Sequence, residues 1–188
     1  MPHVPSPLRL SADRSALWVI DLQEKLVPVV PSGDAVVEQT MRLVEAAKLL
    51  DVPHAATVQY PERLGGLVHP LGDVFDSPEP KRAFSATVCR DALESWAKQA
   101  RDQIVITGIE THVCVLQTVL DLIAEGFRPF VVAEAVAARH GRDHEIAIER
   151  MQMAGATITT VESVMFEWVG TSLHPQFKAI SQLVKKRR

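Results

Sequence analysis

The regular alternation of short apolar runs with longer segments of helical periodicity constrains the fold of this 188-residue chain more than any other feature. A short, continuous apolar run is typical of a buried strand, whereas apolar residues at every third or fourth position indicate an amphipathic helix. Strands are predicted at residues 16–20, 52–60, 103–108, 128–136 and 157–161. Helices are predicted at residues 34–50, 90–100, 113–126, 143–155 and 174–186. This order predicts an α/β fold: a Rossmann-like, three-layer α/β/α single domain over residues 1–188, with a mainly parallel sheet of about six strands.

The ends of these elements carry local signals. Asp34 and Thr111 are placed to act as N-caps of the helices that follow them, and Gly126 is placed to end the helix before it. Residues 61–80 contain four prolines and three glycines, a composition typical of an irregular loop. Loops of that length inside compact domains are often binding loops, so 61–80 is predicted to be an active-site loop. The proline-rich residues 1–14 are predicted to form an extended N-terminal segment.

The charge, hydropathy and cysteine content of the chain exclude several classes of protein. A formal net charge of −3 gives no general attraction for a phosphate backbone, so no nucleic-acid partner is expected. The basic residues 185–188 fit a solvated helix end. No apolar run approaches the roughly 20 residues that cross a bilayer, and the start lacks the pattern of a secretory signal. Two cysteines without CxxC spacing indicate neither a disulfide framework nor a zinc site, so a cytoplasmic protein without a membrane partner is expected.

Three reactive side chains are predicted to meet at the carboxyl edge of the sheet, where parallel α/β folds bind their ligands. Asp21 ends the first strand, Lys81 ends the long loop, and Cys114 follows the strand at 103–108. A thiol in the first turn of a helix is expected to have a lowered pKa, and a nearby lysine would lower it further. Taken singly, the three have structural explanations: a turn or capping residue, a surface lysine and a small buried hydrophobe.

Several ordered motifs resemble the isochorismatase-like cysteine hydrolases over nearly the whole chain. They read VIDLQ (19–23), EPKRAFSA (79–86), TGIETHVCVLQT (107–118) and a closing GTSLHPQFKAISQLV. With VQYPERLG (58–65), the pattern most resembles the subgroup of isochorismatase domain-containing proteins. The resemblance implies the isochorismatase-like hydrolase fold and a hydrolase that forms dimers or larger homo-oligomers.

The resemblance also implies a catalytic triad of Asp21, Lys81 and Cys114. It implies a non-proline cis peptide bond between Ile109 and Glu110, and an oxyanion hole formed by the amides of Glu110 and Cys114. Gln23, Gln59, Tyr60, Phe84 and His112 are predicted to line the substrate pocket. Tyr60 and Phe84 could instead pack in the core or a lid, and His112 could be a polar filler.

The chain departs from two branches of the family. The nicotinamidase branch carries Asp-x-His metal ligands after its second strand, where this chain reads Gln59-Tyr60-Pro61, and only His69 lies in the following loop. One histidine without carboxylate neighbours does not make a metal site, so no metal and no other cofactor is expected. The enzymes that cleave the vinyl ether of isochorismate lack the nucleophilic cysteine, so Cys114 favours attack on an acyl carbon.

The predicted function is therefore metal-independent hydrolysis of a C–N bond in a small amide or imide, through a thioester on Cys114. Two alternatives stay open: a catalytically silent interaction or scaffold protein, and a redox-responsive thiol protein. Elsewhere, Cys89, Trp18 and Trp96 are expected to pack in the core, and Trp168 in the core or an oligomer contact. His140, Asp143 and His144 are expected to cap a helix rather than bind a metal.

Overall fold

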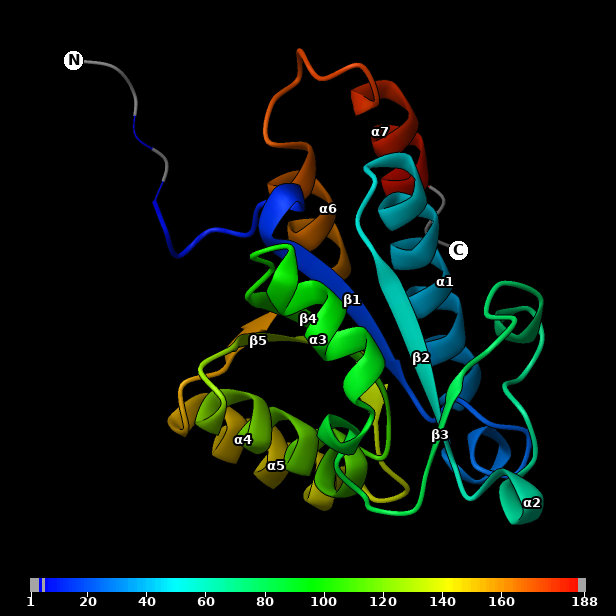
Figure 1. The fold of residues 1–188 in the computed structure, drawn as a ribbon. Coiled ribbons are helices and arrows are strands. Elements are labelled where there is room, and N and C mark those ends of the chain that lie inside the picture. The colour runs from blue at the N-terminus through cyan, green and yellow to red at the C-terminus, as the bar shows by residue number, and fades with distance from the viewer. Residues whose placement is uncertain (1–3, 5, 186–188) are drawn as a thin grey trace.

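Six strands form one sheet in which every neighbouring pair is parallel. The computed structural model describes residue 4 and residues 6–185, so residues 1–3 and 5 of the predicted N-terminal segment and residues 186–188 of the basic end lie outside the described part. The strands are β1 (Ser15–Ile20), β2 (His54–Gln59), β3 (Glu79–Lys81), β4 (Gln103–Ile109), β5 (Arg128–Ala137) and β6 (Thr157–Thr159). Their order across the sheet is β3-β2-β1-β4-β5-β6 (Figure 1). The predicted α/β fold with a parallel sheet is confirmed.

Helices cover both faces of the sheet, which makes three layers (Figure 1). α1 (Gly33–Leu49), α6 (Val161–Val169) and α7 (Phe177–Lys185) pack on one face, and α3 (Arg90–Lys98), α4 (Leu116–Ala124) and α5 (Gly141–Met153) pack on the other. Shorter helical turns are η1 (Ala12–Arg14), η2 (Val27–Val29), α2 (Pro61–Leu64), η3 (Leu71–Asp73), η4 (Ala86–Val88) and the π-helical turn η5 (Thr111–Val115). None of the helices in the described part of the chain is both long and apolar enough to span a bilayer.

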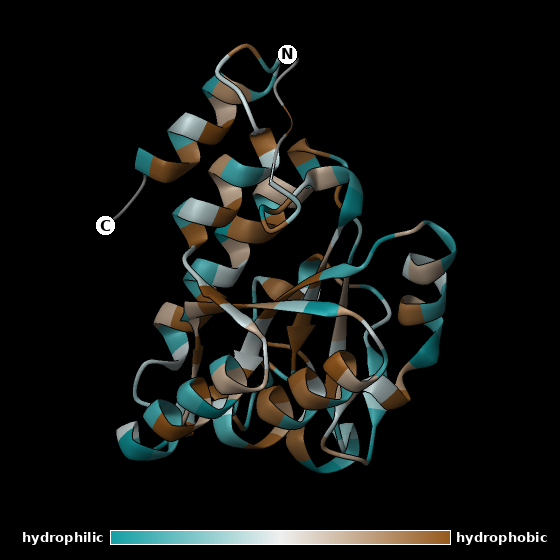
Figure 2. Ribbon diagram, turned by 90° about the vertical axis from the view of Figure 1, so that its left-hand side faces the viewer, coloured by the Kyte–Doolittle hydropathy of each residue, from teal (hydrophilic) through white to brown (hydrophobic). Residues whose placement is uncertain are grey.

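The central strands are apolar because both of their faces are covered. All six residues of β1 are buried, with Trp18 and Ile20 in the core beneath α3 and α4 and with Leu17 and Val19 in the core beneath α1. Figure 2 shows the consequence: the inner strands are largely hydrophobic, whereas the helices carry alternating hydrophobic and hydrophilic stripes. This burial pattern explains why continuous apolar runs identified these strands.

The switch in strand order lies between β1 and β4, which are neighbours although β2 and β3 intervene in sequence. Gly108 of β4 pairs with Ile20 of β1 at the carboxyl end of this pair. Gly108 has a φ of 126°, and a Cβ at this position would lie 2.0 Å from the carbonyl oxygen of Ile20. Glycine is therefore required here for β4 to approach the end of β1.

Two predicted elements differ from the observed ones. Residues 61–80 are not irregular throughout, because α2 begins the segment and Glu79–Pro80 belong to β3, which pairs with Thr57–Gln59 of β2. A proline is tolerated in β3 because this strand lies at the edge of the sheet. The predicted strand at 157–161 ends at Thr159, because the Thr160 hydroxyl accepts a hydrogen bond from the amide of Ser163 and begins α6, a helix that was not predicted.

Both predicted N-caps are wrong. Ser32 occupies the N-cap position of α1, and Asp34 lies in its first turn instead. Thr111 begins the π-helical turn, and its hydroxyl is hydrogen-bonded to His144 Nδ1 of α5 at 2.9 Å rather than to the following backbone. The helix begins two residues earlier than predicted at Asp34 and one residue earlier at Thr111, because the type of a capping residue alone does not fix a helix boundary to the residue.

Candidate active site

A fully buried ion pair joins the ends of β1 and β3 at the carboxyl edge of the sheet. Lys81 Nζ lies 2.7 Å from Asp21 Oδ2, and neither side chain is exposed to solvent. Asp21 Oδ1 accepts a second hydrogen bond from the Thr57 hydroxyl at 2.8 Å. Asp21 has a φ of 55°, in the left-handed region where aspartate is among the more tolerated residues. The end of β1 thus turns sharply at the residue that carries the carboxylate.

Gln59 holds the ammonium group of Lys81 in place, and Gln23 in turn holds Gln59. Gln59 Oε1 accepts a hydrogen bond from Lys81 Nζ at 2.6 Å, and the carbonyl of Phe84 accepts another at 2.9 Å. Gln23, which is fully buried, donates to the carbonyl of Gln59 and accepts from its amide at 2.7 Å. These contacts satisfy the ammonium group with polar atoms, as a buried charge requires.

Cys114 lies in the π-helical turn that follows β4, and its side chain is buried against the same ion pair. The pKa of the Cys114 thiol is raised to about 12, first by burial and then by the charge of Asp21, and the charge of Lys81 offsets only part of this rise. Both Asp21 and Lys81 therefore lie close enough to the thiol to influence its pKa. The sequence-based expectation of a lowered pKa is wrong, because desolvation outweighs the lysine and the helix start.

The turn around Cys114 exposes a distinct backbone arrangement. The peptide bond between Ile109 and Glu110 is cis. The carbonyl of Glu110 accepts hydrogen bonds from the amides of Val113 and Val115, at 3.0 and 3.3 Å. The amide of Cys114, between these two donors along the chain, is not among the donors to that carbonyl. The Glu110 side chain points away to Arg139, whose Nε lies 3.0 Å from Glu110 Oε2.

The residues predicted to line the substrate pocket differ in their burial and in their contact with the ion pair. Gln23 and Gln59 are buried beside the ion pair, and the Phe84 backbone contacts Lys81, with its ring 52% exposed. Tyr60 is also partly exposed, and the Arg82 guanidinium lies 3.7 Å from the centroid of its ring.

His112 faces α5 instead of the ion pair. Its Nε2 lies 3.8 Å from Asp143 Oδ2, and its Nδ1 is buried without a partner among the described residues. His140 occupies the N-cap position of α5 without a side-chain capping bond, Asp143 lies in the first turn, and His144 contacts Thr111. His112 and this cluster thus connect the π-helical turn to α5.

Two threonines of the site were missed in the sequence. Thr57 orients the carboxylate of Asp21, as described above. The Thr118 hydroxyl donates to the carbonyl of Cys114 at 2.6 Å and accepts from the amide of Ala86 at 2.8 Å. The detectable signal was a fully buried polar residue within an otherwise apolar strand or helix face, at both positions.

The remaining cysteine and tryptophans pack in the core. Cys89 is buried, and the pKa of its thiol is raised to about 11, first by burial and then by the charge of Glu79. Trp18 and Trp96 form an edge-to-face pair with ring centroids 5.5 Å apart. Trp168 is buried in the core on the α1 side.

Within residue 4 and residues 6–185, no group of three or more histidine, cysteine or acidic side chains is arranged to hold a metal ion. The prediction of a metal-independent protein stays a prediction.

Comparisons with known proteins agree on one family. The model of the isochorismatase domain matches residues 15–163. The chain is 36% identical to isochorismatase domain-containing protein 2A of Mus musculus, over 95% of this chain and 86% of that protein. It is 38% identical to the secreted isochorismatase effector Isc1 of Phytophthora sojae, over 95% of this chain and 88% of that protein. A solved structure described as MAR1 ribonuclease from Caenorhabditis elegans superposes with a TM-score of 0.87 at 36% identity, covering 95% of this chain and 93% of that one.

The parallel sheet, the residues at its carboxyl edge and these relatives lead to the same conclusion. The chain belongs to the isochorismatase family of hydrolases.

Proposed function

We propose that the protein hydrolyses a C–N bond of a small amide or imide, with Cys114 as nucleophile and without a metal ion. The observation that carries this proposal is the contact of one thiol with a fully desolvated carboxylate–ammonium pair. Such a pair is costly to bury, and a thiol with a perturbed pKa beside charged partners is typical of a site of chemistry.

In the first half of the reaction, the sulfur of Cys114 attacks the carbonyl carbon while its proton passes to the carboxylate of Asp21. The carbonyl oxygen becomes an anion that accepts hydrogen bonds from the amides of Glu110 and Cys114. Asp21 then gives the proton to the leaving nitrogen and the C–N bond breaks, which releases an amine or ammonia from an amide and an amide group from an imide. The enzyme is left as a thioester.

In the second half, a water molecule attacks the thioester carbon and transfers a proton to Asp21. The C–S bond breaks, the carboxylic acid product leaves, and the sulfur of Cys114 recovers the proton from Asp21. Lys81 keeps its positive charge throughout and stabilises whichever of the carboxylate or the sulfur is anionic. Gln23 and Gln59 act as positioning residues, because Gln59 bonds to Lys81, Gln23 holds the backbone of Gln59, and neither contacts the reacting atoms.

The raised pKa of Cys114 supports proton transfer during attack rather than a stored thiolate. A neutral resting thiol also disfavours the redox-responsive alternative, because peroxide reacts with the thiolate form. The scaffold alternative predicts instead that substitution of Asp21, Lys81 or Cys114 leaves the binding of a partner unchanged.

A panel of small amides and imides tests the proposal, with Cys114→Ser compared against the wild-type chain. Turnover is expected to fall by at least about 1,000-fold, because removal of a nucleophile eliminates the covalent route. Cys89→Ala is the matched control, since Cys89 is a buried thiol outside the proposed mechanism, and it is expected to retain turnover. An acyl adduct on Cys114, detected by mass spectrometry, would support the thioester directly. Undiminished hydrolysis by Cys114→Ser would refute the mechanism.

The Caenorhabditis elegans relative favours a second candidate function, the hydrolysis of RNA. The same variants separate the two candidates when short RNA oligonucleotides are assayed beside the amides. RNA cleavage by wild type that persists in Cys114→Ser would favour a phosphodiesterase mechanism without a thioester.

A further inference from the structure

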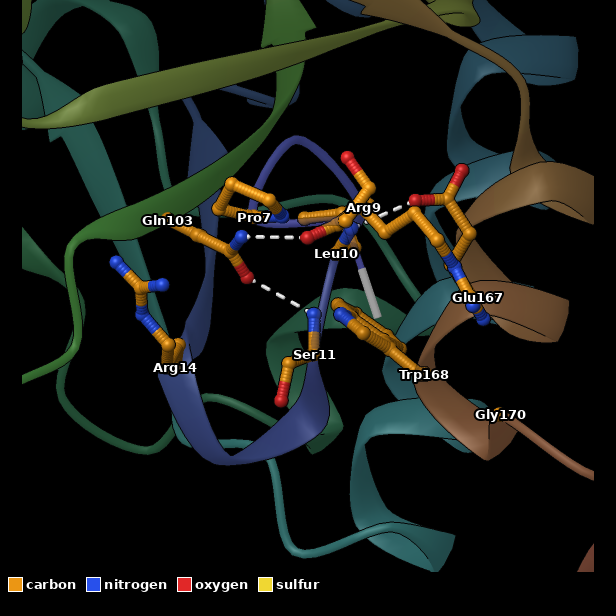
Figure 3. Close-up of a pocket in the computed structure, with 10 residues that line it drawn as sticks. Pro7, Arg9, Leu10, Ser11, Arg14, Gln103, Glu167, Trp168 and Gly170 are labelled. Atoms are coloured by element: carbon orange, nitrogen blue, oxygen red, sulfur yellow. Dashed lines mark hydrogen bonds between the residues drawn. The ribbon is translucent and has the colours of Figure 1, made fainter. Parts of the chain in front are cut away.

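A cavity lies at the amino ends of the strands, opposite the end of the sheet that carries Cys114. It has a volume of about 490 Å³ and sits at the amino ends of β1 and β4, where Arg14 and Gln103 form part of its lining. Segment 6–11 closes one side, and Glu167 and Trp168 of α6 close another (Figure 3). A volume of this size lies within the range of ordinary small-molecule sites.

The walls of this cavity are held by specific hydrogen bonds. Gln103, fully buried, donates to the carbonyl of Arg9 at 2.8 Å and accepts from the amide of Ser11 at 2.9 Å. Glu167 Oε2 accepts from the amide of Leu10 at 2.6 Å. Figure 3 shows both contacts fastening the segment across the cavity. The side chains of α6 and β4 thus give the cavity a defined shape.

One buried donor in the wall has no partner. Trp168 is 4% exposed, and its Nε1 forms no hydrogen bond with any of the described residues. The indole extends from α6 towards Ser11, with its nitrogen at that end (Figure 3). An unpaired buried N–H is costly. Trp18 Nε1 in the core is unpaired within the described part of the chain as well, but Trp168 lines a cavity, so its N–H is the one that a hydrogen-bond acceptor from outside the chain can reach.

The charges around the cavity indicate the nature of that acceptor. The Arg9 guanidinium forms no ion pair or hydrogen bond within residue 4 and residues 6–185, whereas Arg14 is already paired with Asp102. The Arg9 guanidinium and the indole N–H of Trp168 are therefore both free to donate to a ligand. The Glu167 carboxylate disfavours a ligand with two negative charges, and Leu10 and the indole ring offer apolar surface.

We propose that this cavity binds a small organic monocarboxylate, whose carboxylate accepts hydrogen bonds from Trp168 Nε1 and Arg9 and whose apolar body packs on the indole. A carboxylate matches the forked donors of an arginine, whereas an ammonium group has no lone pair and would leave both the guanidinium and the indole N–H without an acceptor. This site is separate from the proposed catalytic site, and its occupancy does not require Cys114.

Benzoate is a suitable probe because it combines one carboxylate with a small apolar ring. In ¹⁵N-labelled wild-type protein, the chain's three tryptophans give separate indole N–H signals, which Trp18→Phe, Trp96→Phe and Trp168→Phe assign. Benzoate is expected to shift the Trp168 indole signal in a saturable manner and to leave the Trp18 and Trp96 signals in place. Benzylamine and benzyl alcohol, of similar size, are expected to cause no saturable shift.

Two variants test the donors. Arg9→Gln is expected to weaken benzoate binding about tenfold through loss of a charge-assisted contact, and Arg63→Gln, an exposed arginine on α2, is the matched control without effect. Trp168→Phe keeps an aromatic ring, although a smaller one, and removes the N–H. It is expected to weaken binding about three- to tenfold, followed through the amide signals of Leu10 and Ser11. Cys114→Ser is expected to bind benzoate as wild type does.

Three results would overturn the proposal. They are the absence of any benzoate-induced shift at Trp168, an equal response to benzylamine, and unchanged affinity in Arg9→Gln. The last variant changes an exposed side chain, so it tests the site even if Trp168→Phe does not fold.

Discussion

The carboxyl ends and the amino ends of the strands are each tied to a neighbouring segment by a buried glutamine, but the ion pairs at the two ends differ in their exposure to water. At each edge a fully buried glutamine bonds to the backbone of a neighbouring segment: Gln23 at the carboxyl edge and Gln103 at the amino edge. At the carboxyl edge the nearby ion pair of Asp21 and Lys81 is fully desolvated. At the amino edge the ion pair of Arg14 and Asp102 stays in contact with water, with side-chain exposures of 45% and 31%.

This difference in exposure matters because neither kind of ion pair is expected to add much to the stability of the fold. A surface ion pair adds little to stability, and a buried one often adds no more than a well-packed apolar pair would. A desolvated pair is therefore explained better by what it does to its neighbours. At the carboxyl edge the neighbour is the thiol of Cys114, whose pKa responds to both charges.

The largest expected effect comes from breaking the desolvated pair. Lys81→Met leaves the Asp21 carboxylate buried without its counter-charge, which is expected to lower the free energy of unfolding by about 3–5 kcal/mol. Urea denaturation measures the change. The double variant Asp21→Leu, Lys81→Met removes both charges and is expected to be more stable than the single variant. A loss below about 1 kcal/mol in Lys81→Met would mean that the carboxyl edge is as hydrated as the amino edge.

The next effect concerns the reactivity of Cys114. In the Cys89→Ala background, alkylation by iodoacetamide is expected to accelerate about tenfold per pH unit from pH 7 to 10 without a plateau, because the pKa lies near 12. In urea the same thiol should level off above its ordinary pKa of 9.0. Because the folded-state pKa is the higher one, the linked stability is complete below pH 9.0 and is lost as the pH rises towards 12. A plateau near pH 7 in the folded protein would contradict desolvation at this edge.

A smaller effect compares the two glutamines. Gln103→Met leaves the carbonyl of Arg9 and the amide of Ser11 without their partner and is expected to cost about 1–3 kcal/mol of stability. Its kcat should not change, since the site lies at the other edge. Gln23→Met is expected to cost a similar amount and also to lower kcat, because Gln23 holds Gln59 and Gln59 holds Lys81. Equal kcat values for the two variants would remove the functional distinction between the edges.

The smallest effect belongs to the exposed pair. Arg14→Gln is expected to reduce the free energy of unfolding by less than about 1 kcal/mol. The loss should shrink further in high salt, because mobile ions already screen exposed charges. Denaturation in low and high salt measures both quantities, and a loss comparable to that of Lys81→Met would contradict the comparison.

The sequence predicted the central sheet well because both faces of these strands are buried, which leaves long apolar runs in β1, β4 and β5. It did not reveal β3, since a three-residue edge strand containing Pro80 has no apolar pattern of its own. α6 was missed for another reason: Thr160 stops β6 and begins the helix, so a single polar residue decides a boundary inside an apolar stretch.

At the site, the order of motifs was enough to select Asp21, Lys81 and Cys114, which lie together in the folded chain. The direction of the thiol's pKa could not be predicted, because it depends on how completely the sheet and helices exclude water from Cys114. The role of Thr57 was hidden as well. Its hydroxyl meets Asp21 only because β2 pairs with β1 in one register, with Thr57 opposite Ile20.

The Thr118 hydroxyl carries a mechanical consequence. It accepts a hydrogen bond from the Ala86 amide and donates one to the Cys114 carbonyl. One oxygen atom therefore connects the segment that follows Lys81 to the turn that carries Cys114. This single hydroxyl thereby helps to fix the position of the Lys81 ammonium group relative to the Cys114 sulfur. Serine at this position would keep the hydroxyl, whereas valine, which has the same shape but no hydroxyl, would lose both hydrogen bonds at once.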